Sequence, residues 1–449
     1  MYRIFIFALI VLLGLFATAC GERELSQITS RTNLSENGLN EAPSDLDEQL
    51  RSLIDKQGIV RLDPVPTPDP QLVDLGQVLF FDKILSGNRD IACATCHHPT
   101  LASGDGIPLP IGTQGVGLGQ ERTLGLGRGF IPRNSPDVFN RGAMEWESMF
   151  WDSRVAVDDN GAFTTPAGNL LPNGLDSVLA AQAMFPVTSV DEMRGHDDGL
   201  GVAGIQNELA LIGDEDLSAM WESITRRLLA YPEYVGLFNA AYPNVALEDI
   251  GFQHSANAIA AFEIDAFSLN DSPWDRYLRG DNDAMSEGMK EGALLFYDQA
   301  GCAECHSGPL LTDQLHHVLA TPQIGPGKGA AAPWDAGRMG VTEDESDFVA
   351  FRTPTLLNVA QTGPWMHDGA YSTLEAVIRH HLEPAKSLAR YDPKYHLPPE
   401  LIDAYQNDEQ MYARMLANLD PILGRLKQLS DAEIVQLIAF LECLTDPAI

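Results

Sequence analysis

The sequence predicts a mainly α-helical protein of two domains with long loops. Apolar residues recur three and four positions apart in several segments, as on one face of a helix, and no segment shows a strong alternating strand pattern. The motif Cys-x-x-Cys-His occurs twice, at residues 93–97 and 302–306, about 210 residues apart. A chain of 449 residues has room for one such motif in each of two domains.

Each Cys-x-x-Cys-His motif predicts covalent attachment of one haem. The two thiols lie one helical turn apart, so both can bond to the vinyl groups of a single haem, and the histidine that follows can ligate its iron. Zinc sites and thioredoxin-like redox pairs also use Cys-x-x-Cys, but the adjacent histidine in both copies favours haem. We therefore expect two covalently held haems, attached through Cys93, Cys96, Cys302 and Cys305, with His97 and His306 as proximal iron ligands.

The chain is strongly acidic, with 29 Lys and Arg against 63 Asp and Glu and a net charge of −34. This charge argues against nucleic-acid binding and favours basic partners, such as a small electron-carrier protein with a positive face. Of the two cysteines outside the haem motifs, Cys443 lies in an apolar run and is expected to be a buried, unreactive thiol.

Residues 1–19 have the pattern of a secretory signal. Arg3 precedes an apolar run that is too short for a comfortable membrane span, and small residues stand before Cys20. This ending is similar to a bacterial lipoprotein box, which implies cleavage before Cys20 and its lipidation; an ordinary signal peptide with a coincidental cysteine is the alternative. In both cases we expect an exported, periplasm-facing protein, and with the lipoprotein box it meets the membrane only through a lipid anchor.

Residues 20–70 are polar and acidic, and they end in a proline at every second position from Pro64 to Pro70. Such a segment buries too little apolar surface to fold alone, and its prolines favour an extended backbone. It is predicted to be a lipidated tether.

A helical pattern begins at Gln71, where Leu72, Leu75, Val78 and Leu79 share one helical face and predict a short helix before the first haem motif. Later segments carry the same type of apolar spacing. Further helices are predicted over residues 217–230, 254–267, 286–297, 373–382 and 431–444.

Two stretches are predicted to be long loops. Residues 111–129 are dense in glycine, but no strand and helix flank these glycines as in a nucleotide-binding loop. Residues 155–174 contain two Asn-Gly turn signals. Turn residues near 272–281 mark the predicted boundary between an N-terminal haem domain, residues 71–280, and a C-terminal haem domain, residues 281–449.

Several short blocks follow one another in a characteristic order between the helices. The blocks are LG at 75–76, LFFD at 79–82, RNSP at 133–136, FWD at 150–152, SPWDR at 272–276, FRTPTL at 351–356 and PWMHDG at 364–369. With the two haem motifs, this order resembles the bacterial dihaem cytochrome c peroxidase family, which includes the MauG-like enzymes, from about residue 72 to residue 444. The resemblance implies cytochrome c-like domains, an N-terminal haem that meets peroxide and a C-terminal haem that passes electrons.

The resemblance also implies roles for four residues around the N-terminal haem. Gln182 and Glu192 match the distal glutamine and glutamate of the family, and Pro186 matches the proline between them. A carboxylate above an open ferric iron can take a proton from bound peroxide and return it to the leaving oxygen. Trp151 matches the tryptophan that the family places between the haems, where an aromatic ring can relay an electron.

A calcium site between the domains is a further implication of the resemblance. Asn134, Thr362 and Pro364 match its ligands, through the Asn side chain and backbone carbonyl oxygens. Oxygen ligands suit calcium, although the sequence has no recognisable calcium loop of its own.

The chain departs from the family pattern in the loop after the first haem motif. Many family peroxidases have a histidine there that caps the peroxidatic iron until the other haem is reduced. Apart from His98, beside the proximal ligand, no histidine occurs here before His196. We therefore expect an iron that is five-coordinate or water-bound and needs no reductive opening.

A second departure concerns the distal ligand of the C-terminal haem, which is methionine in the peroxidases and tyrosine in MauG. The spacing from the PWMHDG block leads to His381, so we expect His306/His381 ligation, with His380 and Met366 as alternatives. Histidine in place of methionine lowers a haem potential and favours MauG-like chemistry.

These observations lead to three functional hypotheses. The first is a dihaem peroxidase that reduces hydrogen peroxide to water with electrons from a small carrier protein such as cytochrome c. The second is MauG-like oxidation of a partner protein's side chains, and the third is a non-catalytic dihaem electron-transfer cytochrome. A homodimer is compatible with all three.

Overall fold

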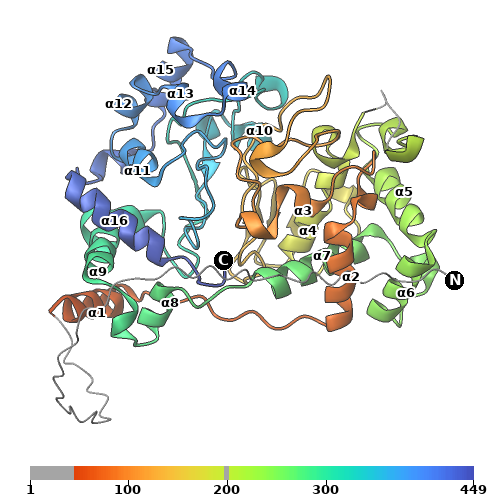
Figure 1. The fold of residues 1–449 in the computed structure, drawn as a ribbon, viewed down its shortest axis with the longest axis horizontal. Helices are drawn as coiled ribbons and strands as arrows, with labels where there is room; N and C mark the ends of the chain where they lie inside the picture. The colour runs from red at the N-terminus through yellow and green to blue at the C-terminus, as the bar shows by residue number, and fades with distance from the viewer. Residues whose placement is uncertain (1–44, 197–201) are drawn as a thin grey trace, which may run out of the picture. The chain divides into compact units, whose positions relative to one another are not determined.

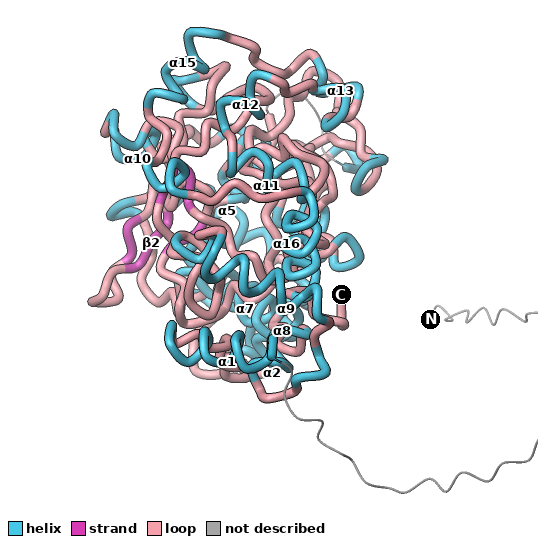
Figure 2. Tube along the Cα trace, turned by 90° about the vertical axis from the view of Figure 1, so that its left-hand side faces the viewer, coloured by secondary structure: helices cyan, strands magenta, loops and turns pink. Residues whose placement is uncertain are grey.

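The computed structural model describes residues 45–196 and 202–449, which belong to one compact unit. The predicted signal sequence and Cys20 lie outside the described residues. Among the described residues, no helix combines the length and apolar character needed to cross a membrane. The mainly α-helical class is confirmed (Figures 1 and 2).

The order of the elements follows the predicted pattern of helices separated by long loops. The helices are α1 (Asp45–Gln57), α2 (Pro70–Phe81), α3 (Cys93–Cys96), α4 (Val178–Ala183), α5 (Leu217–Leu229), α6 (Pro232–Ala241), α7 (Phe252–Phe267), α8 (Pro273–Leu278), α9 (Glu287–Leu294), α10 (Met339–Thr342), α11 (Leu374–Leu382), α12 (Pro384–Ala389), α13 (Pro393–His396), α14 (Pro399–Ile402), α15 (Glu409–Ala417) and α16 (Asp431–Cys443). The strands are β1 (Ser148–Met149), β2 (Val155–Val157), β3 (Phe163–Thr164), β4 (His316–His317) and β5 (Phe351–Arg352).

The predicted helices are observed close to their expected bounds because their ends carry strong local signals. Helix α2 begins with Pro70 in its first turn, where the Asp69 carboxylate accepts a hydrogen bond from the Gln71 amide at 2.8 Å. Helix α16 begins after Ser430, which forms a capping box with Glu433.

Two helix pairs, α2 with α7 and α9 with α16, cross at very short range. A Cβ atom on Gly76 of α2 would lie 1.8 Å from the backbone oxygen of Ala258 in α7. A Cβ atom on Gly292 of α9 would lie 2.0 Å from the backbone oxygen of Gln436 in α16. Only glycine therefore permits these backbone contacts.

The two crossings are built from similar sequences. Residues 76–82 read GQVLFFD and residues 292–298 read GALLFYD, and in each segment a phenylalanine, Phe80 or Phe296, is fully buried. Each segment leads into one Cys-x-x-Cys-His motif. The structure thus contains two related helix crossings, one before each motif, and the domain boundary near residue 280 stays a prediction.

Helix α1 corrects the predicted tether, which was expected to extend as far as residue 70. Leu50, Leu53 and Ile54 share one face of α1 and are buried, and Asp47 forms an ion pair with Lys290 of α9 at 2.8 Å. Apolar residues three and four apart are enough to dock this short helix, although its overall composition is polar. Figure 1 shows α1 beside α8 and α9 rather than beside α2, its successor in the chain.

The predicted loop over residues 155–174 contains two of the three strands of a small antiparallel sheet, in the order β1-β2-β3. Its turn is stabilised by Asp158, whose carboxylate accepts hydrogen bonds from the amides of Asn160 and Ala162. The glycine-rich loop folds around the buried Arg122, whose guanidinium donates to the carbonyl oxygens of Ile111, Gly112 and Gly117.

The substitution Gly76→Ala should lower the free energy of unfolding by about 3 kcal/mol, because the added methyl group forces α2 away from α7. Denaturant titration of the holoprotein measures this change. Gly236→Ala in α6 is the matched control: no atom lies within 4 Å of its added Cβ, so stability should be unchanged or rise by about 0.5–1 kcal/mol. Equal effects of the two substitutions would contradict the close crossing.

Candidate active site

The first haem motif lies at the wall of a cavity with an empty volume of about 1360 Å³, part of it open to solvent. Cys93 and Cys96 come from the single turn of α3, and His97 follows it directly; all three line the cavity.

The His97 ring is oriented as a metal-ligating histidine would be. Its Nδ1 lies 3.3 Å from the carbonyl oxygen of Ser103, which can only accept, so Nδ1 carries the proton and Nε2 is left with a free lone pair. Burial lowers the pKa of His97 to about 4, which keeps the ring neutral.

The second motif repeats this arrangement in a cavity of about 1650 Å³, lined by Cys302, Cys305 and His306. The Nδ1 of His306 lies 3.2 Å from the carbonyl oxygen of Leu311, and burial lowers the pKa of His306 to about 4. One c-type haem fits each cavity, because each has two thiols and a neutral imidazole.

Of the three candidates for the distal ligand of the second haem, His381 has the geometry of a ligand. It lines the second cavity, and its Nδ1 donates to the carbonyl oxygen of Val377 at 2.8 Å, which leaves Nε2 free. The neighbouring His380 points elsewhere, with its two nitrogens 2.8 Å from Tyr371 and from Leu319. Met366 also lines the cavity.

Gln182, Pro186 and Glu192 all line the first cavity, as the resemblance implied. Gln182 belongs to α4, Pro186 opens the next turn, and Glu192 lies in a π-helical turn over Val190–Arg194. Burial raises the pKa of Glu192 above its ordinary value, although the positive charges of Arg154 and Lys328 act in the opposite direction.

In the part of the chain that the structure describes, the first cavity has no second histidine in its lining. Among the described residues that line it, His97 is the single histidine. His196, the next histidine after His98 in the chain, lies instead beside Asp191 at 3.4 Å.

Trp151 lies in the wall between the cavities and lines both of them, as does Asn134. The indole Nε1 of Trp151 donates to the backbone oxygen of Asn134 at 3.0 Å. This hydrogen bond fixes the Trp151 ring against Asn134, which also lines both cavities.

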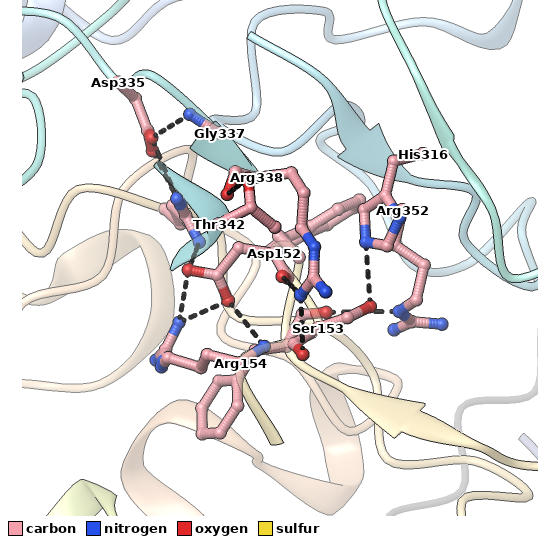
Figure 3. A network of polar contacts seen from close by, with 12 residues as sticks. Asp152, Ser153, Arg154, His316, Asp335, Gly337, Arg338, Thr342 and Arg352 are labelled. Carbon is pink, nitrogen blue, oxygen red and sulfur yellow. Dashed lines mark hydrogen bonds and ion pairs between the residues drawn. The ribbon is translucent and has the colours of Figure 1, made fainter. Parts of the chain in front are cut away.

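A buried cluster of charges includes Asp152, the residue after Trp151, and Figure 3 shows Asp152 with Arg154, Asp335 and Arg338. Arg133 contacts Asp152 at 2.6 Å and Asp335 at 2.6 Å and 2.8 Å. Burial disfavours the Arg133 charge, but the two carboxylates raise its pKa overall. Arg338 donates to the backbone oxygens of Asp152 and Ser153, at 2.7 Å and 2.9 Å.

The three residues predicted to bind calcium have different surroundings. The Asn134 amide nitrogen donates to the carbonyl oxygens of Ile107 and Pro108, which leaves its amide oxygen available to a cation. Thr362 and Pro364 line the second cavity together with Asn134. These contacts are compatible with an oxygen-ligated ion, and the calcium site stays a prediction.

Sequence reasoning missed several cations of the first cavity, among them Arg154 and Lys328. Arg154 binds the Asp152 carboxylate at 3.0 Å and 3.2 Å, and Lys328 reaches the same cavity from a loop far along the chain. Burial, followed by the charge of Arg154, lowers the pKa of Lys328 to about 8. Lys328 has no motif around it, whereas Arg154 lies two residues beyond the FWD block, which was the available signal.

Glu263 of α7 is a further missed residue of this cavity. Burial raises its pKa to about 8, although the charge of Arg141 opposes this shift. A carboxyl group that is largely protonated at neutral pH therefore lies near Cys93. Glu263 lies in an apolar helix without a recognisable motif, so no sequence pattern gave a reason to select it.

Comparisons with known proteins agree with this geometry. A family model described as di-haem cytochrome c peroxidase matches residues 70–283. The methylamine utilization protein MauG of Methylorubrum extorquens is 32% identical over 332 residues, which cover 72% of this chain and 73% of that protein. Cytochrome c551 peroxidase of Pseudomonas aeruginosa is 31% identical over 305 residues, which cover 68% of this chain and 70% of that protein.

A solved structure gives the same result at the level of the fold. The crystal structure of a MauG-like protein associated with microbial copper homeostasis superposes with a TM-score of 0.59 and 27% identity, and the match covers 87% of this chain and 94% of that one. The chain belongs to the di-haem cytochrome c peroxidase family. As a member of this family it is an oxidoreductase with two c-type haems.

Replacing Cys93 and Cys96 together by serine should halve the covalently bound haem, because each cavity has one pair of thiols. Pyridine haemochrome absorbance and the mass of the intact protein measure the change from two haems to one. Cys443→Ser is the control, since this thiol is buried in α16, and it should retain both haems. A double variant that still carries two covalent haems would contradict the assignment.

Proposed function

We propose that this protein reduces hydrogen peroxide to water with electrons from a small carrier protein. The observation that carries the proposal is the first cavity: Glu192 and Gln182 line it together with His97, and no other described histidine does. A haem held there by Cys93, Cys96 and His97 would supply the redox chemistry for cleavage of the oxygen-oxygen bond.

The residues of the chain supply the proton transfers. Glu192, as the carboxylate, takes the proton from the oxygen of peroxide that approaches the iron and returns it to the oxygen that leaves as water. Gln182 holds the peroxide by hydrogen bonds, and Pro186 shapes the pocket between them. The overall reaction uses hydrogen peroxide, two electrons and two protons, and it produces two molecules of water.

The electrons enter through the second cavity. We infer that the iron there is ligated by His306 and His381, since both rings donate Nδ1–H to a carbonyl oxygen and line the same cavity. A haem held by both imidazoles would supply electron transfer rather than a site for peroxide. Trp151, in the wall of both cavities, relays electrons between the haems.

MauG-like oxidation of a partner protein is the second candidate. A histidine in place of methionine at position 381 favours it, because histidine ligation lowers the haem potential and makes electron uptake from a high-potential cytochrome less favourable. The β2–β3 hairpin offers such a partner an exposed turn. A specific oxidised product on a copurifying protein would distinguish this function from peroxide reduction.

The proposed setting is the periplasm, where c-type haem is attached. The acidic chain suits a basic electron donor. Mass spectrometry of the mature N-terminus tests the proposed lipid anchor at Cys20. Metal analysis of the purified protein tests the proposed calcium ion. Light scattering tests the proposed homodimer.

Glu192→Gln should lower kcat/KM for peroxide by about 100- to 10,000-fold, because the amide cannot accept the proton. Stopped-flow measurement of the reaction with peroxide gives this value. Glu222→Gln, on the exposed side of α5, is the control and should leave the rate unchanged. Full activity of Glu192→Gln would overturn the peroxidase proposal and favour the electron-transfer cytochrome.

The pH dependence of kcat/KM follows from the raised pKa of Glu192. Since the carboxylate is the reactive form, the rate should rise with pH, with a midpoint above the ordinary value of 4.5 for glutamate. A pH profile of wild-type protein and of Glu192→Gln measures this limb, which should be absent from the variant. If kcat/KM of the variant rises with pH in the same way, the rise belongs to another titrating group.

His381→Ala should convert the second haem from low spin to high spin, because the iron loses one axial ligand. The electron paramagnetic resonance (EPR) spectrum of the oxidised protein measures the conversion. His380→Gln should leave this haem low spin, since His380 points away from the cavity. Loss of the low-spin signal in His380→Gln but not in His381→Ala would reverse the assignment.

A further inference from the structure

A buried tyrosine–histidine pair lies beside the second cavity. Tyr371 is 2% exposed, and its hydroxyl oxygen lies 2.8 Å from Nδ1 of His380 and 3.0 Å from the hydroxyl oxygen of Ser387. The Nε2 of His380 lies 2.8 Å from the carbonyl oxygen of Leu319, which can only accept a hydrogen bond. Nε2 therefore carries the proton of the neutral ring, and Nδ1 accepts the hydrogen bond from the Tyr371 hydroxyl.

This pair is connected to the second cavity on two sides. His380 is followed in α11 by His381, which lines the cavity. Trp365 also lines the cavity, and its backbone pairs with that of Tyr371 through hydrogen bonds of 2.9 Å and 3.3 Å. Tyr371 is therefore linked to residues of the cavity lining through its own backbone and through His380.

From Tyr371 a series of aromatic rings leads away from the cavity. The ring centroids are 5.5 Å apart for Tyr371 and Tyr391, 5.0 Å for Tyr391 and Tyr405, and 6.4 Å for Tyr405 and Tyr412. Tyr371 is buried, whereas the other three rings are half-buried. The series thus connects the interior to the surface around α13, α14 and α15, in the upper part of Figure 1.

We propose that Tyr371 is a redox-active residue that donates one electron to the dihaem centre after reaction with peroxide. The inference rests on the proposed function, because hydrogen peroxide is the oxidant. As the electron leaves Tyr371, the phenolic proton moves along the hydrogen bond to Nδ1 of His380, so a neutral tyrosyl radical faces a protonated imidazole. Both changes are reversed when one electron returns to Tyr371.

The remaining tyrosines give the returning electron its route. An electron donor at the surface reduces the radical through Tyr412, Tyr405 and Tyr391. Successive ring centroids along this route are 5.0–6.4 Å apart, short enough for electron tunnelling. The exposed side chains beside Tyr405 and Tyr412 include Asp403, Asp408 and Glu409. This surface therefore suits a donor protein with a basic face.

EPR spectroscopy of holoprotein frozen shortly after mixing with hydrogen peroxide tests the inference. The expected result is an organic radical signal that narrows when the protein contains ring-deuterated tyrosine. The signal should be lost in Tyr371→Phe, which preserves the ring but removes the hydroxyl. Tyr395→Phe is the matched control, since Tyr395 is 81% exposed and lies outside the series, and it should keep the full signal.

Two further measurements keep the test independent of the folding of one variant. In wild-type protein, the coupling of the radical to the Cβ protons reports the ring orientation, which must match that of Tyr371. In Tyr391→Phe the radical should form as before but persist longer in the presence of a donor, because the route for the returning electron is interrupted.

Peroxide consumption by wild-type protein without any tyrosine-derived signal, or an undiminished signal in Tyr371→Phe, overturns the inference and leaves the proposed peroxidase function intact. A ring orientation that differs from that of Tyr371 also overturns it. Wild-type protein with both haems that does not react with peroxide overturns both the proposed function and this inference.

Discussion

The position of Arg133 between Asp152 and Asp335 is the constraint on which the candidate site depends. A buried guanidinium is stable only if carboxylates and hydrogen bonds replace its water, and removal of one partner of a buried ion pair typically costs about 3–5 kcal/mol. Asp152 directly follows Trp151, and Asp335 lies almost two hundred residues further along the chain. One charge cluster therefore binds two distant segments and holds the tryptophan between the cavities.

The two cavities share the geometry of the attached histidine but differ in the opposite wall. The first is lined by carboxyl groups, among them Glu192, by the Gln182 amide and by several cations, which can exchange protons and orient a small polar molecule. The second is lined mostly by apolar residues, and the described part of its lining has three histidines besides His306, namely His317, His367 and His381. The two cavities thus combine the same type of haem attachment with different chemical surroundings.

Much of the fold was predictable from local patterns, because helices begin and end at residues with strong capping and apolar spacing. The predicted segment 217–230 corresponds to α5 and the predicted segment 373–382 to α11, whose Thr373 is the N-cap. The tether prediction was wrong for residues 45–57. Composition averages over a whole segment, whereas three well-spaced apolar residues, Leu50, Leu53 and Ile54, are enough to dock a helix.

The sequence by itself determined the two haem attachments, because the chemistry needs thiols and imidazole at one fixed local spacing. Ordered family blocks also led to Gln182 and Glu192. Only the tertiary structure decided that His381 rather than His380 lines the second cavity, because adjacent residues on a helix point in different directions and the rotation of α11 is set by packing. The same holds for Lys328, which reaches the first cavity through long-range folding that no local pattern records.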